Sequence, residues 1–282
     1  MTIKNAQTKL KEKLVTIYEP QEALNITNWV MESLTGLSRI DRLVKETHLL
    51  STEQTQLFDQ YLNDLLTYRP VQYVLGEAYF YGHRFYVQEG VLIPRPETEE
   101  LVDWIVKDAV NKPIDILDIG TGSGCIPVSL KVTLPNATVQ SVDISDRAIA
   151  IARRNATDLS AEITFLHRDF LSWEQYEWQP IDILVSNPPY IPQSEKAGMI
   201  AQVTEHEPSI ALFVADEEPL IFYHQLARFG KKYLKENGAV YIEIHEDLGA
   251  ETRQAFELEG YQTVIIKKDF QGKERMIKAR LS

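Results

Sequence analysis

Short apolar runs recur along the chain after about residue 113, with longer amphipathic stretches between most of them. Runs of this length, bounded by turn residues, predict buried strands, and their alternation with helices predicts a mostly parallel sheet that is covered on both faces. The last two runs leave no room for a helix between them, so one of these strands should be antiparallel. The seven runs are Ile114–Ile119, Thr138–Val142, Ile163–Leu166, Ile181–Ser186, Gly238–Ile244, Thr263–Ile266 and Arg275–Ala279.

The first part of the chain has helical periodicity instead. Gln21–Leu34 carries apolar residues on one face and is followed by Gly36, which suits a helix end. Ser51-Thr52-Glu53-Gln54 matches a capping box, and Pro70 closes the helix that this box begins. We expect a small helical bundle. The apolar stripe of the second helix could form a core or a groove for a partner, and core packing is the favoured interpretation; the stripe is Leu57, Phe58, Tyr61, Leu62, Leu65 and Leu66.

A β-hairpin is expected between these two parts. Ala78–Val87 contains two aromatic runs that flank Gly82-His83, a pattern typical of a hairpin. Pro96 and the acidic run Glu97–Glu100 then suit the start of a helix. We therefore predict an α/β protein in three parts: a helical domain at residues 1–77, a hairpin linker at 78–95 and a Rossmann-like domain at 96–282.

Charge and composition narrow the possible functions. The formal net charge is −12, whereas binding to bare nucleic acid relies on clustered Lys and Arg residues, and no such cluster is visible. The single cysteine, Cys125, excludes an intrachain disulfide and fits a reducing compartment. No secretory signal opens the chain, and no apolar run reaches the roughly 18 residues of a membrane span. We expect a soluble cytoplasmic protein that binds neither membranes nor nucleic acid directly.

A glycine-rich turn follows the first strand of the predicted sheet. Gly120-Thr121-Gly122-Ser123-Gly124 would let the backbone approach a ligand closely, and the next helix would present free N–H groups to it. The spacing differs from the Gly-x-Gly-x-x-Gly of dinucleotide binders. Asp143, after the second strand, lies where doubly wound folds keep an acid for ribose hydroxyls. That acid would suit NAD or S-adenosylmethionine equally, or it could be the N-cap of a helix from Ser145 to Thr157.

The third strand ends near Asp169 and Phe170. An acid and an aromatic ring at this position could bind the amine edge and the face of an adenine. A loop aspartate beside a core phenylalanine explains the same two residues equally well.

The fourth strand ends in Asn187-Pro188-Pro189-Tyr190. Proline fixes its own φ and pushes the preceding residue into extended geometry, so Asn187 should be held stiffly at the strand end. The Asn187 side-chain oxygen and a proline carbonyl can each accept a hydrogen from a planar NH2 group, while the Tyr190 ring can lie against its face. Alone, the motif could be a turn that stops a strand. The glycine turn and the two acids upstream favour the binding interpretation.

Together these strand ends resemble the class I S-adenosylmethionine-dependent methyltransferases that methylate planar nitrogen. The runs Arg69–Gly76 and Leu92–Glu99 are similar to signatures of the peptide chain release factor N5-glutamine methyltransferases, the HemK family. The resemblance covers nearly the whole chain from about Arg69, and more loosely the helical part before it. It implies a class I methyltransferase domain at residues 96–282.

The resemblance also implies a cofactor, a substrate and a set of site residues. The cofactor is S-adenosylmethionine, with S-adenosylhomocysteine as product, and the protein substrate is the glutamine of the Gly-Gly-Gln loop of release factors. Asn187 to Tyr190 would hold this glutamine, with Asn187, Pro188 and Tyr190 as the catalytic residues. The expected cofactor contacts are Gly120, Thr121, Gly122, Ser123, Gly124, Asp143, Asp169, Phe170 and Asn187.

The expected chemistry is a direct displacement at the methyl group. Holding both reactants in near-attack geometry can supply about 7–11 kcal/mol of the barrier, more than a single general base provides. We therefore predict neither a metal nor a catalytic His or Glu, and Glu205-His206-Glu207 is interpreted as structural. Two alternatives remain: methylation of an exocyclic amine on a DNA or RNA base, and a binding module that performs no transfer.

Overall fold

The computed structural model describes residues 1–109 and 113–281, which form two compact units. The first unit consists of Met1–Glu77 together with a later segment, Ile200–His206. The second consists of Ala78–Met199 and the chain from Glu207 onward. The return of residues 200–206 to the first unit means that the two units are not consecutive stretches of sequence.

The first unit is a helical bundle. Its capping box is present as predicted: the Ser51 hydroxyl accepts from the Gln54 backbone N–H, and the Gln54 side chain accepts from the Ser51 backbone N–H. Phe58, Leu62 and Leu65 are buried, and Tyr61 and Leu66 pack against them partly buried, which confirms a core role for most of the stripe. Leu57 is the exception, because it is 37% exposed and lies outside this core. The helices are α1 (Ile3–Leu14), α2 (Pro20–Thr35), α3 (Arg39–Val44), α4 (Thr52–Leu65), α5 (Val71–Leu75) and α9 (Ala201–His206).

The predicted hairpin is also present. Strands β1 (Glu77–Phe80) and β2 (His83–Tyr86) pair with each other. Phe80 and Phe85 are buried in edge-to-face contact, with ring centroids 6.1 Å apart, and join the core of the second unit. Aromatic packing therefore fixes this hairpin on the domain that follows it.

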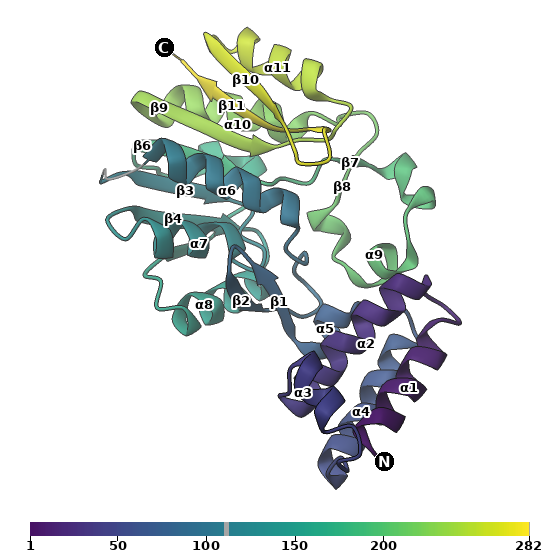
Figure 1. Cartoon of the computed structure of the whole chain (residues 1–282). Coiled ribbons are helices and arrows are strands. Elements are labelled where there is room, and N and C mark those ends of the chain that lie inside the picture. The colour runs from purple at the N-terminus through teal and green to yellow at the C-terminus, as the bar shows by residue number, and fades with distance from the viewer. Residues whose placement is uncertain (110–112, 282) are drawn as a thin grey trace. The chain divides into compact units, whose positions relative to one another are not determined.

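A seven-stranded sheet forms the centre of the second unit (Figure 1). The strand order is β10-β11-β9-β6-β3-β4-β5, and β11 runs in the opposite direction to the other six strands of this sheet. This confirms the expectation that one of the last two strands reverses direction. The strands are β3 (Asp115–Ile119), β4 (Thr138–Asp143), β5 (Thr164–His167), β6 (Ile181–Ser186), β9 (Leu234–Glu243), β10 (Thr263–Lys268) and β11 (Glu274–Arg280).

Helices cover both faces of this sheet. Successive strand residues point to opposite faces, so Ile116 belongs to the hydrophobic cluster with α6 (Pro96–Ala109), α7 (Cys125–Thr133) and α8 (Asp146–Asp158). Its neighbour Leu117 belongs to the cluster with α10 (Ile221–Tyr233) and α11 (Gly249–Leu258). The smaller elements are η1 (Phe170–Gln175), β7 (Ile191–Pro192), η2 (Gln193–Gly198), η3 (Ser209–Ala211) and β8 (Phe213–Val214).

The parallel strands bring the predicted motifs to one edge of the sheet. The glycine turn follows β3, Asp143 ends β4, and Asn187 follows β6. In open α/β sheets, ligands bind at the carboxyl ends of the strands. Among the described residues, no helix combines the length and the apolar character that a membrane crossing requires.

Candidate functional site

The glycine turn has a left-handed backbone conformation that only glycine adopts readily. Gly120, Gly122 and Gly124 have φ values of 85°, 53° and 83°. A Cβ on Gly124 would lie 3.0 Å from Cβ of Ala152, so this glycine also permits α7 and α8 to approach closely. The turn leads directly into α7, and the first N–H groups of a helix have no acceptor within the helix, which suits a ligand cradle.

Asp143 braces this turn from the neighbouring strand. Its carboxylate accepts from the backbone N–H of Gly122 at 2.9 Å and of Ser145 at 2.8 Å. The N-cap of α8 is Ser145, whose hydroxyl accepts from Ala148, so Asp143 is not the cap. Burial raises the pKa of Asp143, and the backbone donors counteract part of that rise. A carboxylate has about four acceptor sites, so Asp143 can still accept from hydroxyl groups of a ligand.

Asp169 and Phe170 make contacts within the protein that their sequence pattern does not indicate. The Asp169 carboxylate accepts from the Leu171 backbone N–H at 2.9 Å and from the Ser172 hydroxyl at 2.8 Å, which caps η1. The Phe170 ring is buried against Phe229, with centroids 5.5 Å apart. Both residues nevertheless line the pocket described next.

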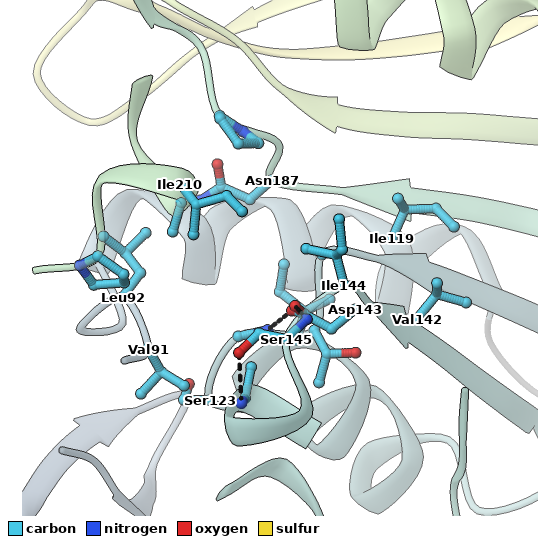
Figure 2. A pocket seen from close by; sticks show the side chains of 18 of the residues that line it. Val91, Leu92, Ile119, Ser123, Val142, Asp143, Ile144, Ser145, Asn187 and Ile210 are labelled. Atoms are coloured by element: carbon cyan, nitrogen blue, oxygen red, sulfur yellow. Dashed lines mark hydrogen bonds between the residues drawn. The ribbon is translucent and has the colours of Figure 1, made fainter. Parts of the chain in front are cut away.

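A pocket occupies the carboxyl edge of the sheet between these elements (Figure 2). Its wall includes residues 120–123 of the glycine turn, Asp143, Asp169, Phe170, Asn187 and Pro189, whereas Gly124 is not among the lining residues. Three apolar side chains in this wall are exposed: Ile144 at 48%, Leu171 at 38% and Ile210 at 62%. The sequence analysis did not identify Ile144 or Leu171, although Ile144 directly follows the strand-end acid. Pro188 and Tyr190 are not among the lining residues.

Asn187 is held by a residue from a distant helix. Its Nδ2 donates to the Thr98 hydroxyl of α6 at 3.1 Å, which leaves its side-chain oxygen as an acceptor. The Tyr190 hydroxyl donates to Glu243 at 3.0 Å, and burial raises the pKa of Tyr190 well above its ordinary value. Asn187 and Tyr190 thus have fixed partners behind the motif.

Glu207 fastens one wall of the pocket. Its carboxylate, with only 2% of the side chain exposed, accepts from the Ile93 backbone N–H at 3.1 Å and from Arg95 at 2.6 Å. This clamp holds the wall segment around Leu92 near Pro208. These contacts agree with the interpretation of Glu207 as structural, and they show partners that are more than a hundred residues away in the sequence.

The fold and the pocket define a methyltransferase of the class I type. Residues 98–207 match the family model "Methyltransferase small domain", and residues 5–76 match "PrmC N-terminal domain". A solved methyltransferase from Pyrococcus furiosus shares the fold, with a TM-score of 0.52 and 16% identity over 71% of this chain and 90% of that one.

Sequence relatives identify the family. A release factor glutamine methyltransferase of Flavobacterium psychrophilum is 41% identical over 99% of both chains. Another from Bacteroides thetaiotaomicron is 40% identical over 96% of this chain and 97% of its own. The chain belongs to the release factor glutamine methyltransferase family. Family and fold together imply an enzyme that depends on S-adenosylmethionine.

The pocket residues fit that cofactor. S-adenosylmethionine carries ribose hydroxyls, for which Asp143 keeps acceptor sites beside the glycine turn. Its flat adenine suits the exposed apolar surfaces of Ile144 and Leu171.

Proposed function

We propose that this enzyme transfers a methyl group from S-adenosylmethionine to N5 of the glutamine in the Gly-Gly-Gln loop of a peptide chain release factor. The observation that carries the proposal is the Asn187 side chain, which lines the pocket with its Nδ2 bound to Thr98 and its oxygen left to accept from a planar amide. The substrate class is supported by the family to which the chain belongs. Such a substrate would place the enzyme in the cytoplasm, with the translation machinery.

The cofactor would lie along the glycine turn. Asp143 would accept hydrogen bonds from the ribose hydroxyls. The side chains of Ile144 and Leu171 would make apolar contacts with the adenine ring. Thr121, Ser123, Asp169 and Phe170 would complete the cofactor wall that they line. When bound, S-adenosylmethionine supplies an electrophilic methyl group on a sulfonium.

The chain's own residues would prepare the acceptor nitrogen. A glutamine amide delocalises its lone pair into its carbonyl and is a poor nucleophile. The Asn187 oxygen and the Pro188 carbonyl would accept its two hydrogens, while Tyr190 would lie against the amide plane. These bonds would orient the nitrogen toward the methyl group, and holding the two reactants in this geometry would accelerate the transfer. Attack by the neutral NH2 group would give an N-methylated cation that is strongly acidic and loses one proton to water afterwards, so the step needs no dedicated base.

The helical unit would recognise the protein partner. It consists of residues 1–77 and Ile200–His206, and its family model is separate from that of the methyltransferase domain. Nothing in residues 1–77 resembles catalytic chemistry, so binding of the release factor is its proposed role.

The same motif could in principle receive an exocyclic amine of adenine or cytosine. That reaction requires an extruded base and a surface that neutralises the phosphate backbone. The net charge of −12 disfavours such a surface. We therefore propose that nucleic acid is not a substrate.

A glutamine-to-asparagine substrate tests the proposal. Asparagine keeps the amide but withdraws it by one methylene, and even about 1 Å of misplacement can cost 10²-fold in rate. Labelled methyl transfer should be strong with a release factor that carries Gly-Gly-Gln, nearly absent with Gly-Gly-Asn and absent with single-stranded or duplex DNA. Label on adenine or cytosine, with none on the release factor, would replace this proposal with the base-methylating one.

A further inference from the structure

A buried carboxylate lies behind the Asn-Pro-Pro-Tyr motif. Glu243 ends β9 with 2% of its surface exposed, and it accepts two hydroxyl bonds: from Thr98 at 2.6 Å and from Tyr190 at 3.0 Å. Thr98 in turn accepts from Nδ2 of Asn187 at 3.1 Å. Glu243 therefore contacts both polar side chains of the motif. It binds Tyr190 directly and Asn187 through the hydroxyl of Thr98.

The chemistry of these groups fixes the direction of every bond. Both carboxyl oxygens of Glu243 accept, Oε2 from the Thr98 hydroxyl and Oε1 from Tyr190, so the Thr98 hydrogen is directed to Glu243. The hydroxyl has a single hydrogen, so toward Asn187 it can only accept. Asn187 must therefore turn its NH2 to Thr98. The other end of the amide, the oxygen, remains for the substrate.

Opposing influences act on the carboxyl group of Glu243. Burial is the largest and raises its pKa on balance, whereas the two donated hydroxyl bonds and the positive charge of Arg275 lower it. Arg275 is itself held between Asp269 at 3.1 Å and Glu246 at 3.0 Å. A buried carboxyl group is costly to keep, and here one oxygen binds Tyr190 of the motif while the other binds Thr98, which holds Asn187.

We propose that Glu243 and Thr98 are positioning residues that set the polarity of the Asn187 amide, so that an acceptor and not a donor meets the substrate nitrogen. This inference rests on the proposed function. Without Thr98 the Asn187 amide could rotate by half a turn and present NH2 to an NH2. The substrate amide would then lose its acceptor and its aim at the methyl group.

Substitutions at Thr98 separate this role from packing. Thr98→Val keeps the shape but removes the hydroxyl, and it should lower kcat for methylation of the release factor by about tenfold or more, with little change in the cofactor Kd. Thr98→Ser keeps the hydroxyl and should restore most of kcat. Thr252→Val is the matched control: Thr252 is also fully buried in the second unit, and its hydroxyl has no partner among the described residues. This control should leave kcat unchanged.

A double-mutant cycle tests whether Thr98 acts through Asn187. In an Asn187→Ala background the polarity no longer matters, so Thr98→Val should cost little more than Asn187→Ala alone in single-turnover methyl transfer. Glu243→Gln, which can donate to Thr98 and reverse the bond directions, should lower kcat without lowering the thermal unfolding temperature, because the amide has the same shape and carries no charge to bury.

Each outcome bears on a separate claim. Equal losses in Thr98→Val and Thr98→Ser, or additive losses in the cycle, would overturn the positioning role. If Asn187→Ala is too slow to measure, the valine and serine pair together with Glu243→Gln decides the question. A wild-type enzyme that places no methyl on the release factor would instead contradict the proposed function itself.

Discussion

Replacing Asp143 should weaken cofactor binding, by more for alanine than for asparagine. Asp143 accepts from Gly122 and Ser145 and retains acceptor sites for ribose hydroxyls. A hydrogen bond to a charged group contributes about 1.5–3 kcal/mol, so Asp143→Ala should raise the Kd by roughly 10- to 150-fold. Because the substitution also frees the Gly122 N–H, the upper part of this range is expected. Asp143→Asn keeps one acceptor oxygen and should fall between the wild type and alanine.

Calorimetry with S-adenosylmethionine or S-adenosylhomocysteine measures this effect directly. Asp146→Ala is the matched control: it removes the same charged group three residues away, from a side chain that is 83% exposed, and should leave the Kd within about twofold. Thermal unfolding of each variant establishes that it is folded. A folded Asp143→Ala protein with the wild-type Kd would refute the ribose contact and leave Asp143 only its role in bracing the glycine turn.

Three further predictions concern other parts of the molecule. Asn187→Ala should lower kcat by about a hundredfold while the cofactor Kd stays unchanged, because it removes the acceptor that orients the amide; a folded variant with full turnover would contradict this. Deleting residues 1–77 should spare cofactor binding and methyl transfer to a short glutamine peptide but cripple methylation of the intact release factor; a full rate on the intact protein would give the helical unit another purpose. Burial raises the pKa of Asp118 from 3.8 to about 7. Between these pH values the folded protein keeps a proton on Asp118 that the unfolded chain releases. The free energy of unfolding should therefore fall as the pH rises from about 4 to 7, by about 1.4 kcal/mol per unit of pKa shift. Asp118→Asn should remove that slope in urea unfolding measured across this pH range, and an identical slope in both proteins would refute the assignment.

The strands and the glycine turn could be predicted because their signals are local. The run Ile181–Ser186 was identified with the bounds that the structure has, and Ser51 with Gln54 forms the predicted cap. Hydrophobic periodicity and capping chemistry act over a few residues, so a single sequence contains them. The reversal of the last strand pair followed from loop length alone.

The residues that hold the site from behind could not be predicted, because their hydrogen bonds join positions that are far apart in the sequence. Thr98 and Glu243 are separated by 145 positions, and Glu207 by 114 from Ile93. Neither a threonine in a first helical turn nor a glutamate at a strand end has a local pattern that indicates its partner. The involvement of Asp169 in capping η1 likewise depends on a turn that the sequence did not specify.

The central claim is that this enzyme methylates a release factor glutamine. Purified enzyme, S-adenosylmethionine and an unmethylated release factor should be incubated together and the product digested for peptide mass mapping. A single added methyl group is expected on the peptide that contains Gly-Gly-Gln, located by fragmentation to the glutamine side chain. An unmodified Gly-Gly-Gln peptide, under conditions in which the enzyme binds its cofactor, would contradict this claim.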